Sequence, residues 1–424
     1  MKLLLSGDIH LGRTSTRLPG TLKQEAGSTA SAWHRLVDLA LAREVDLVCL
    51  SGDMVDADNR FWEAVGPLEQ GIRRLADKGI TTLVVSGNHD HDVLPRLADA
   101  VNSPWLRLLG RGGAWQRYVH SGDHGPLLAV DGWSFPQQDV TRDPVSAYQP
   151  SDPGAPVLVL LHGELDAPGS RYAPLDRPSM QALPVDGWIL GHNHNPPGER
   201  QDRGAAPILY VGAPQALDPS EFGLHGPWIA ELDAEGIRNL TQIPCSDVRY
   251  ETLRVDLSGV HSEEVFESTV LSGLDDFAAE IASEAGPLRY LSLRLELFGQ
   301  TELAPRLPGL STNLTDTERQ MQQFLVGLDK TAITATAPVD LQEYARSDTP
   351  PGALARILLE LDREEPSQEV RDLISRTQRK LEESGGRRDC SLLSEGVKTD
   401  AKAARRVLRL EAGNLLSELL RQAP

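Results

Sequence analysis

Five short groups of polar residues in this 424-residue chain each follow directly on an apolar run. In an extended chain, residues i and i+2 point to the same side, so Asp8 and His10 can face one target while Ile9 packs the other way. The same spacing relates His192 to His194. A lone His or Asp at a strand end is usually a turn or a cap, whereas five such groups in order indicate one shared site. The groups are Asp8-Ile9-His10, Gly52-Asp53, Gly87-Asn88-His89-Asp90, His162-Gly163 and Gly191-His192-Asn193-His194.

These groups supply oxygen and imidazole donors without a thiolate, a set that suits borderline divalent ions such as Mn²⁺, Fe²⁺ or Zn²⁺. Seven ligands are too many for one ion that keeps an open catalytic position. They suit two ions about 3.5–4 Å apart with a shared carboxylate, which is an arrangement for phosphoester hydrolysis. The seven candidate metal ligands are Asp8, His10, Asp53, Asn88, His162, His192 and His194.

Residues 1–240 alternate between apolar runs and amphipathic stretches, which predicts an α/β fold with layered sheets covered by helices. In open α/β sheets, ligands bind at the carboxyl ends of the strands, and the five polar groups fall at such ends. We therefore expect the fold to bring them together. The expected strands are 2–5, 45–50, 80–85, 127–130, 157–161, 187–190, 208–211 and 228–232, and the expected helices are 33–43, 61–78 and 93–101.

Two further regions follow, at 246–338 and 339–424. In the first, alternating and helical patterns predict a small β-α-β module. The last region has charged, amphipathic patterns and is expected to be helical. The expected elements are a strand at 253–257, a helix at 262–284, a strand at 291–297, a connection at 303–310, a helix at 315–327, an extended stretch at 330–337, and helices at 352–363, 367–383 and 399–421.

The composition bears on the binding partner and on the cellular compartment. The formal net charge is −19, whereas proteins that bind nucleic acid usually present a basic surface, although a local patch or bound ions can oppose the global field. Cys49, Cys245 and Cys390 form no CxxC pair, which fits a reducing cytoplasm. The N-terminal MKLLLSGD is too short for a signal peptide, and no apolar stretch approaches the length of a membrane span. A cytoplasmic protein without membrane attachment is expected.

The ordered set D-x-H, GD, GNHD, HG and GHNH resembles the motifs of the calcineurin-like metallophosphoesterases over about residues 1–240. Three further features look like one branch, the SbcD/YhaO-type DNA repair exonucleases. They are the segment YVGAPQALDPSEFGLHGPW at 210–228, the β-α-β module at 249–297 and the helical C-terminal extension. The resemblance implies a layered two-sheet metallophosphoesterase domain, a small DNA-binding capping domain and a helical C-terminal region that binds a partner.

The resemblance also implies roles for the site residues. Two divalent ions are expected, Mn²⁺ first, with Mg²⁺, Fe²⁺ or Zn²⁺ as alternatives. Asp53 bridges them, and His89 is the catalytic residue that acts near the leaving oxygen rather than as a ligand. The first ion takes Asp8, His10, Asp53 and His194, and the second takes Asp53, Asn88, His162 and His192.

The main reading is thus a metal-dependent DNA nuclease in DNA repair, a 3′–5′ exonuclease with endonuclease activity. The resemblance implies an SbcC-like SMC-type ATPase as the partner, and a homodimer is compatible with this assembly. The chain has no GxxxxGK(S/T) motif, so it is not expected to hydrolyse ATP by itself. Arg13, Arg17 and Arg60 lie in loops after metal motifs and are candidates for contacts with DNA phosphates; plain solvated arginines are the alternative.

Two other functions remain open at this point. A phosphodiesterase or phosphatase of the same fold would act on a small nucleotide or a phosphoprotein, and the motif set does not choose between these substrates. A scaffold that uses the fold without catalysis would be expected to have lost ligands, and none of the seven is missing.

Overall fold

The structure, a computed structural model, describes seven stretches of the chain. They are residues 1–23, 26–56, 61–195, 206–284, 286–315, 318–385 and 400–422. By its internal contacts the chain divides into two compact units. One combines Met1–Leu253, Leu274–Arg294 and Thr315–Lys330, and the other combines Arg254–Gly273, Leu295–Leu314 and Thr331–Pro424. The division into domains at 1–240, 246–338 and 339–424 stays a prediction.

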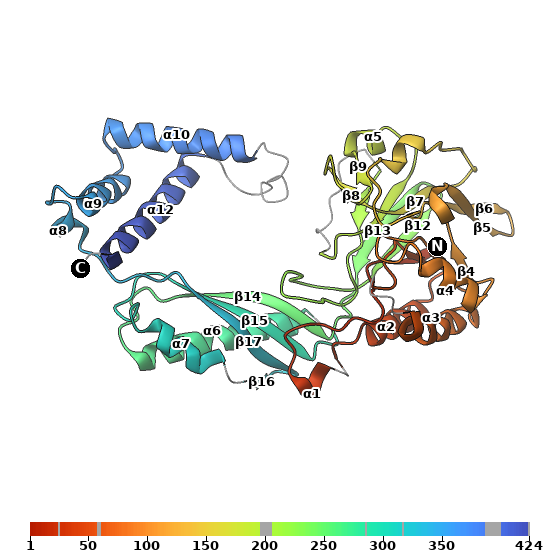
Figure 1. Cartoon of the computed structure of the whole chain (residues 1–424), viewed down its shortest axis with the longest axis horizontal. Helices are drawn as coiled ribbons and strands as arrows, with labels where there is room; N and C mark the ends of the chain where they lie inside the picture. The colour runs from red at the N-terminus through yellow and green to blue at the C-terminus, as the bar shows by residue number, and fades with distance from the viewer. Residues whose placement is uncertain are drawn as a thin grey trace. The chain divides into compact units, whose positions relative to one another are not determined.

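A six-stranded sheet in the first unit has the order β13-β12-β1-β2-β3-β4 (Figure 1). Strands β1 to β4 are parallel, whereas β12 is antiparallel to β1 and β13 to β12. The loops after β1, β2 and β3 therefore leave the sheet at the same edge. The strands are β1 (Lys2–Ser6), β2 (Leu47–Leu50), β3 (Thr81–Val84), β4 (Leu106–Leu108), β12 (Trp228–Asp233) and β13 (Gly236–Gln242).

A five-stranded sheet has the order β11-β10-β7-β6-β5. Its strands β6, β7, β10 and β11 are parallel, so the loops after β7 and β10 also share one edge. The layered α/β architecture expected from the sequence is confirmed. The strands are β5 (Gln116–Gly122), β6 (Gly125–Gly132), β7 (Val157–His162), β10 (Gly187–Gly191) and β11 (Ile208–Tyr210).

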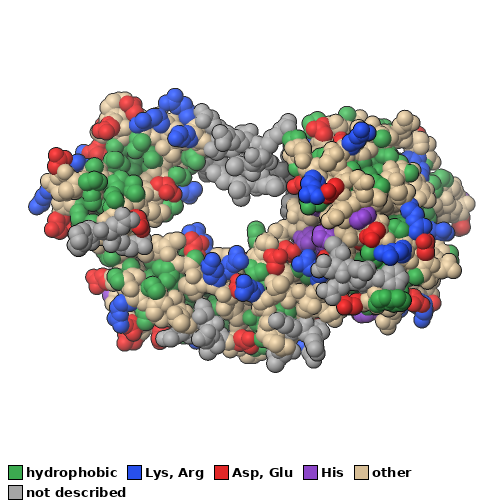
Figure 2. Space-filling model, viewed as in Figure 1, with side chains coloured by type: hydrophobic (Ala, Val, Ile, Leu, Met, Phe, Trp, Pro, Cys, Tyr) green, Lys and Arg blue, Asp and Glu red, His purple; other side chains and the backbone are tan. Residues whose placement is uncertain are grey.

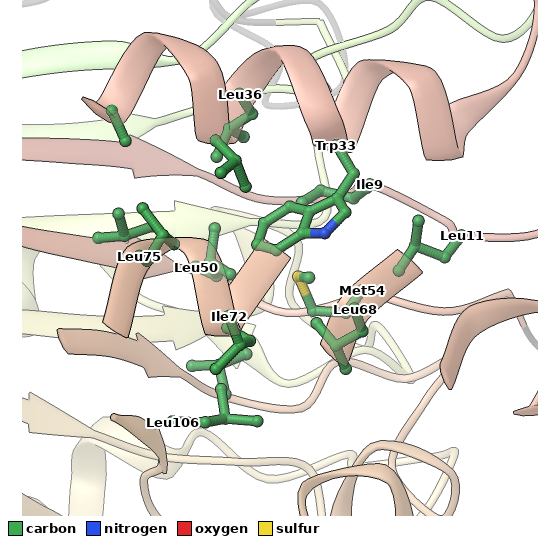
Figure 3. Packing of buried hydrophobic residues seen from close by; sticks show 14 of the residues in the cluster. Ile9, Leu11, Trp33, Leu36, Leu50, Met54, Leu68, Ile72, Leu75 and Leu106 are labelled. Carbon is green, nitrogen blue, oxygen red and sulfur yellow. The ribbon is translucent and has the colours of Figure 1, made fainter. Parts of the chain in front are cut away.

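Alternate residues of β1 point into two different cores. Leu4 belongs to a cluster with Trp33 and Ile72, which come from the helices on one face of the six-stranded sheet (Figure 3). Leu3 and Leu5 belong to a second cluster, which joins residues of both sheets. Because both faces of β1 are buried, its sequence is a continuous apolar run and not an alternating one.

Helices α2 (Thr29–Ala42) and α3 (Phe61–Ala76) carry Trp33 and Ile72. The strands and helices predicted for residues 1–240 are present, with ends that differ by a few residues. The remaining elements of this part are α1 (Gly20–Lys23), α4 (Leu94–Val101), α5 (Arg177–Gln181), β8 (Glu164–Leu165), β9 (Pro174–Leu175) and 3-10 turns at Arg111–Gly113 and Pro144–Ala147.

A four-stranded sheet in the order β14-β15-β17-β16 follows in the sequence. The strand-helix-strand order predicted over 253–297 is confirmed. The strands are β14 (Val248–Asp256), β15 (Tyr290–Phe298), β16 (Arg319–Met321) and β17 (Phe324–Ile333), and the helices are α6 (Glu263–Ser283) and α7 (Leu307–Thr315).

The helix predicted at 315–327 is wrong, because these residues lead from the end of α7 into the β16–β17 hairpin. Glu and Gln in this stretch favour helix, but propensity is a weak preference that packing overrides. Phe324 and Val326 are buried at alternate positions, as a strand requires. Gln322, with φ of 49°, forms the left-handed turn that reverses the chain. The connection expected at 303–310 also contains the start of α7.

The C-terminal helices pack around a small core of their own. Leu361, Val370, Ile374 and Ala404 are its buried residues, contributed by three of the helices. The three helices expected in this region are confirmed as α9 (Pro350–Leu361), α10 (Gln368–Gly385) and α12 (Ala401–Gln422). A short helix that was not expected, α8 (Leu341–Tyr344), precedes them. Among the described residues, no helix combines the length and apolarity that crossing a membrane requires.

Candidate metal centre

The loops after β1 and β2 hold polar residues in an unusual backbone conformation. Asp8, His10 and Asp53 have φ angles of 49°, 49° and 50°, in the left-handed region that residues other than glycine rarely adopt. Backbone hydrogen bonds join the loops: Asp8 N donates to the Gly52 carbonyl and His10 N to the Asp53 carbonyl, each at 3.0 Å, and Leu11 N donates to the Met54 carbonyl at 2.8 Å. Such strain persists only where the surrounding structure fixes it, and it is concentrated at functional sites.

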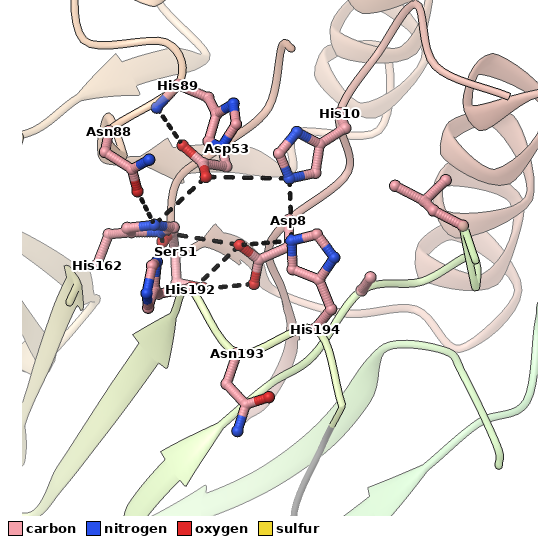
Figure 4. A network of polar contacts seen from close by, with 12 residues as sticks. Asp8, His10, Ser51, Asp53, Asn88, His89, His162, His192, Asn193 and His194 are labelled. Atoms are coloured by element: carbon pink, nitrogen blue, oxygen red, sulfur yellow. Dashed lines mark hydrogen bonds and ion pairs between the residues drawn. The ribbon is translucent and has the colours of Figure 1, made fainter. Parts of the chain in front are cut away.

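Two imidazoles face each other beside the Asp8 carboxylate (Figure 4). Nε2 of His10 and Nε2 of His194 are 3.1 Å apart, and His194 Nε2 is 4.0 Å from Asp8 Oδ1. Candidate ligand atoms of these three residues all lie within 4.8 Å of one another. Asp53 Oδ2 is 3.9 Å from His10 Nε2. The structure thus brings together the four side chains assigned to the first ion.

A second cluster joins Asp8, Asp53 and His162. Nδ1 of His162 is 3.0 Å from the Ser51 carbonyl, which can only accept, so the imidazole proton lies on Nδ1. His162 Nε2 therefore presents a lone pair. It faces Asp53 Oδ2 at 3.4 Å and Asn88 Oδ1 at 3.1 Å. These three atoms present lone pairs to one another, and a cation between them would relieve their repulsion. A divalent ion fits such a set of nitrogen and oxygen ligands.

Two buried carboxylates give the centre negative charge. Burial raises the pKa of Asp8, and nearby His194 opposes this only in part. Burial acts in the same direction on Asp53, but the charges of His162 and His10 outweigh it and hold the pKa of Asp53 below its usual value. Since Asp53 Oδ2 faces Nε2 atoms of both clusters, it lies where a bridging carboxylate would be needed.

His192 lies close to the cluster but is placed differently from the other candidate ligands. Its backbone N donates to both Asp8 carboxylate oxygens at 3.1 Å, and its ring centroid is 5.3 Å from that of His162. Among the described residues it belongs to none of the Asp, Glu and His groups whose ligand atoms approach within 4.8 Å. Burial lowers the pKa of His192 to about 4, so its imidazole is neutral, as a metal ligand must be.

His89 lies at the exposed side of the centre. Its backbone N donates to Asp53 Oδ1 at 2.9 Å, and its ring contacts that of His10 edge to face at 5.0 Å. His89 Nδ1 is 3.6 Å from Asp56 Oδ1, and this carboxylate raises the pKa of His89. Figure 2 shows histidine side chains reaching the surface of the two-sheet part of the chain. His89 is therefore a partly exposed imidazole beside the candidate ligands, and the Asp56 carboxylate favours its protonated form.

Asp56 was not among the residues predicted for this site. Its Oδ1 lies 3.5 Å from His10 Nδ1 as well as near His89, and the two imidazoles hold the pKa of Asp56 well below its usual range. The only signal in the sequence is its position three residues after Asp53. That spacing becomes informative only once the loop conformation is known.

Glu221 is a second residue of this site that was not predicted from the sequence. Its Oε1 is 2.7 Å from Nδ1 of His194, and its Oε2 accepts from Leu217 N at 2.7 Å. Burial lowers the pKa of His194, but the hydrogen bond to Glu221 and the charge of Asp8 outweigh it and raise the pKa to about 9. A carboxylate behind a metal-binding histidine fixes its orientation and makes it a stronger ligand. Glu221 is one of the two acidic residues, with Asp218, in the quoted segment at 210–228.

The buried carboxylate of Asp90 connects the loops that follow β2 and β3. Its fully buried carboxylate accepts from Gly87 N through Oδ1 and from Met54 N through Oδ2, both at 2.8 Å. Burial raises the pKa of Asp90 well above its usual value. Because Met54 and Gly87 are neighbours of Asp53 and Asn88, this carboxylate fixes the relative position of the two ligands.

The three candidate DNA-binding arginines differ in their surroundings. Arg13 is half-buried, and its charge helps to lower the pKa of Asp56. Arg17 is exposed and forms an ion pair with Asp329 at 3.3 Å. Arg60 lies outside the described residues. The structure therefore associates Arg13 with the metal centre and Arg17 with a neighbouring surface.

Comparison with known proteins agrees with this geometry. Residues 1–196 match the family model of the calcineurin-like phosphoesterases. An uncharacterized metallophosphoesterase of Bacillus subtilis, YhaO, is 25% identical over 247 residues, which cover 54% of this chain and 56% of YhaO. The DNA double-strand break repair protein Mre11 of Haloferax volcanii is 27% identical over 275 residues, which cover 61% of this chain and 55% of Mre11. The chain spans about half the length of these curated relatives.

A solved structure, a dimetal phosphatase from Danio rerio, is 14% identical with a TM-score of 0.36 and covers 57% of this chain and 98% of the phosphatase. The family match includes all seven candidate ligands, of which His194 is the last in the sequence. Residues 1–196 therefore resemble the calcineurin-like phosphoesterases in sequence, and the converging donors of the candidate metal centre lie among them.

Proposed function

We propose that this chain is a metallophosphoesterase and, within that class, a DNA nuclease of DNA repair, a 3′–5′ exonuclease with endonuclease activity that uses two Mn²⁺ ions. Two clusters of candidate metal ligands support the chemistry: Asp8, His10 and His194, and Asp8, Asp53 and His162. His89 lies beside them, with its backbone N bonded to Asp53. The choice of DNA is supported by similarity to YhaO and Mre11 over more than half of the chain, which extends beyond the phosphoesterase domain.

In this proposal the ligands and His89 have separate tasks. Two bound divalent ions would supply a nucleophile at neutral pH and neutralise charge on the phosphate. Asp53 holds its position between the donor clusters, and Ser51 keeps the His162 proton on the nitrogen that faces away from them. His89, whose protonated form Asp56 favours, would donate a proton to the sugar oxygen as its bond to phosphorus breaks.

We also propose that an SbcC-like SMC-type ATPase works with this chain in the cell. The sequence has no phosphate-binding GxxxxGK(S/T) loop, so energy from ATP would have to come from a partner. Helix α12 exposes Leu410 and Leu415, which offers apolar surface for such a protein. A second copy of this chain is compatible with the same assembly.

A small-substrate phosphodiesterase or phosphatase is the second candidate function. The net charge of −19 favours it, because an acidic protein repels the phosphates of a long DNA duplex. The same metal centre would serve both functions, so only the substrate separates them.

The test compares DNA with a small diester. End-labelled single-stranded and duplex DNA are incubated with the full chain in Mn²⁺ or EDTA, beside an Asn88→Ala variant. The proposal expects cleavage that needs Mn²⁺ and is lost in the variant. Hydrolysis of bis-p-nitrophenyl phosphate without any cut in DNA, with the partner ATPase present as well, would reject the nuclease and leave the small-substrate enzyme.

A further inference from the structure

An open groove of about 280 Å³ adjoins the segment that supports the metal centre. Its lining includes Phe222, Thr252, Ser292 and Arg294, all within the first compact unit. Phe222 directly follows Glu221, whose carboxylate contacts the candidate ligand His194. The groove therefore begins one residue away from the support of the metal centre.

Phe222 is an exposed aromatic residue on a fixed backbone. Its side chain is 64% exposed, although large apolar side chains are usually covered. Its backbone pairs with that of Tyr250 in a β-bridge, and Gly223 N donates to the Tyr250 carbonyl at 3.2 Å. Tyr250 is itself held by its hydroxyl, which donates to the Thr16 carbonyl at 2.5 Å. The ring is thus presented to solvent from a rigid base.

Arg294 lines the same groove as Phe222, and Arg17 pairs with Asp329, which also lines it. Arg294 is 48% exposed and Arg17 is 66% exposed, and both approach Asp329 through Nε, at 3.8 Å and 3.3 Å. Because Asp329 is only 10% exposed, it holds the guanidinium groups in place while they remain open to solvent. Glu251 also lines the groove, but its carboxylate pairs with Arg249 at 2.6 Å.

We propose that this groove binds an unpaired stretch of polynucleotide next to the phosphodiester that is cut. The Phe222 ring stacks on one base, and Arg294 and Arg17 contact the phosphates on either side. An exposed aromatic ring flanked by cations is the combination that single-strand binding proteins use, and a base stacks on such a ring only when it is unpaired. This inference rests on the proposed nuclease function and deepens it, since it names single-stranded ends as the preferred substrate.

The first experiment separates bases from phosphates. Fluorescence anisotropy in EDTA measures binding of a labelled oligothymidine and of an abasic oligomer of equal length to the full chain. The wild-type chain is expected to bind the oligothymidine more tightly, and Phe222→Ala to lose roughly 5- to 150-fold of that affinity, as expected for one stacked base. Phe222→Trp should keep the preference.

Leu127→Ala is the matched control, because it removes another exposed apolar side chain, 49% exposed, from strand β6. It should leave the ratio of the two affinities unchanged. Equal binding of both oligomers by the wild-type chain would overturn the stacking site, whatever the variants do. Because this comparison uses only the wild-type chain, its result does not depend on whether a variant folds.

The second experiment tests the arginines. For single strands, each neutralised phosphate contributes about 0.7 to the slope of log affinity against log salt. Arg294→Gln should reduce that slope by about 0.7 for both oligomers. An unchanged slope would remove Arg294 from the phosphate contacts.

Cleavage by the wild-type chain distinguishes the two proposals. If DNA is cut but the oligomers bind equally, the groove inference fails and the nuclease stands. If the oligothymidine is preferred but no DNA is cut, the groove binds nucleotides and the nuclease fails. If the chain neither binds nor cuts DNA, both fail.

Discussion

At the scale of single residues, oxygen atoms that contact Nδ1 of the imidazoles determine which ring nitrogen faces the candidate metal ligands. The Ser51 carbonyl holds a proton on Nδ1 of His162, and Glu221 contacts Nδ1 of His194. Both rings therefore turn Nε2 toward the donor clusters. The sequence predicted the converging ligands, because their motifs are local, but not Glu221, because its contact spans 27 residues of folded chain.

His89→Ala and Asp53→Ala should separate catalysis from metal binding. Removing the proton donor is expected to reduce turnover of a diester by roughly 10²–10⁴-fold while metal content is kept. Removing Asp53, which faces both donor clusters, should lose the ions. Metal analysis of the purified variants beside their turnover decides the matter, and an equal loss of metal in both would contradict the separation of roles.

Asp56→Asn should shift the pH dependence of hydrolysis. Asp56 raises the pKa of His89, and the protonated ring is the active form, so activity falls as pH rises through that pKa. Without the carboxylate the pKa of His89 drops, and the alkaline limb of the pH–rate profile should move to lower pH. Asp92→Asn, at an exposed ion pair with Arg96, is the control and should leave the profile in place.

Glu221→Gln should weaken metal binding by about 10- to 100-fold, as expected when the group behind a histidine ligand is changed. Calorimetric titration of the metal-free chain with Mn²⁺ measures this loss. Glu235→Gln, at an exposed turn, provides the comparison. Equal Mn²⁺ affinity of both variants and the wild type would mean that Glu221 does not support a ligand.

At the scale of elements, the strand ends predicted from apolar runs were found, because buried parallel strands leave continuous apolar sequence. The hairpin at 319–333 was not, since its Gln residues favour helix and its burial depends on distant partners. Packing of α2 on α3 is equally hidden in the sequence. The Trp33 indole donates to the Pro67 carbonyl at 2.8 Å and lies where a side chain at Gly71 would be.

Gly71→Ala should therefore destabilise the fold although alanine favours helix. Its Cβ would meet Trp33 Nε1 at 2.3 Å, and overpacking of this kind costs about 1–3 kcal/mol of unfolding free energy. Gly66→Ala in the same helix has no heavy atom within 4 Å of its Cβ and should stabilise by up to about 1 kcal/mol. Urea unfolding of both variants measures the difference, and equal effects would contradict close packing at Gly71.

At the scale of the whole molecule, the metal centre and the C-terminal helices depend on different residues. All residues of the centre lie between 8 and 221, whereas the core of the last helices draws on residues 357–408. The sequence predicted both regions from their patterns. The net charge of −19, in contrast, gave no indication that Arg17 and Arg294 both approach Asp329. Their grouping arises only from folding.

A chain that ends at residue 338 should therefore keep its hydrolysis of bis-p-nitrophenyl phosphate. The truncated and full chains are compared for turnover and for Mn²⁺ binding, and both quantities are expected to agree. Loss of Mn²⁺ binding on truncation would show that the C-terminal helices support the centre.

The left-handed backbone at Asp8, His10 and Asp53 has a consequence for engineering. Each such residue holds about 1–3 kcal/mol of strain, which glycine at the same position would relieve. Laboratory selection for heat resistance alone would thus favour replacement of residues that form the candidate metal centre. A thermostable variant of this chain has to be sought at other positions, with turnover screened in every round.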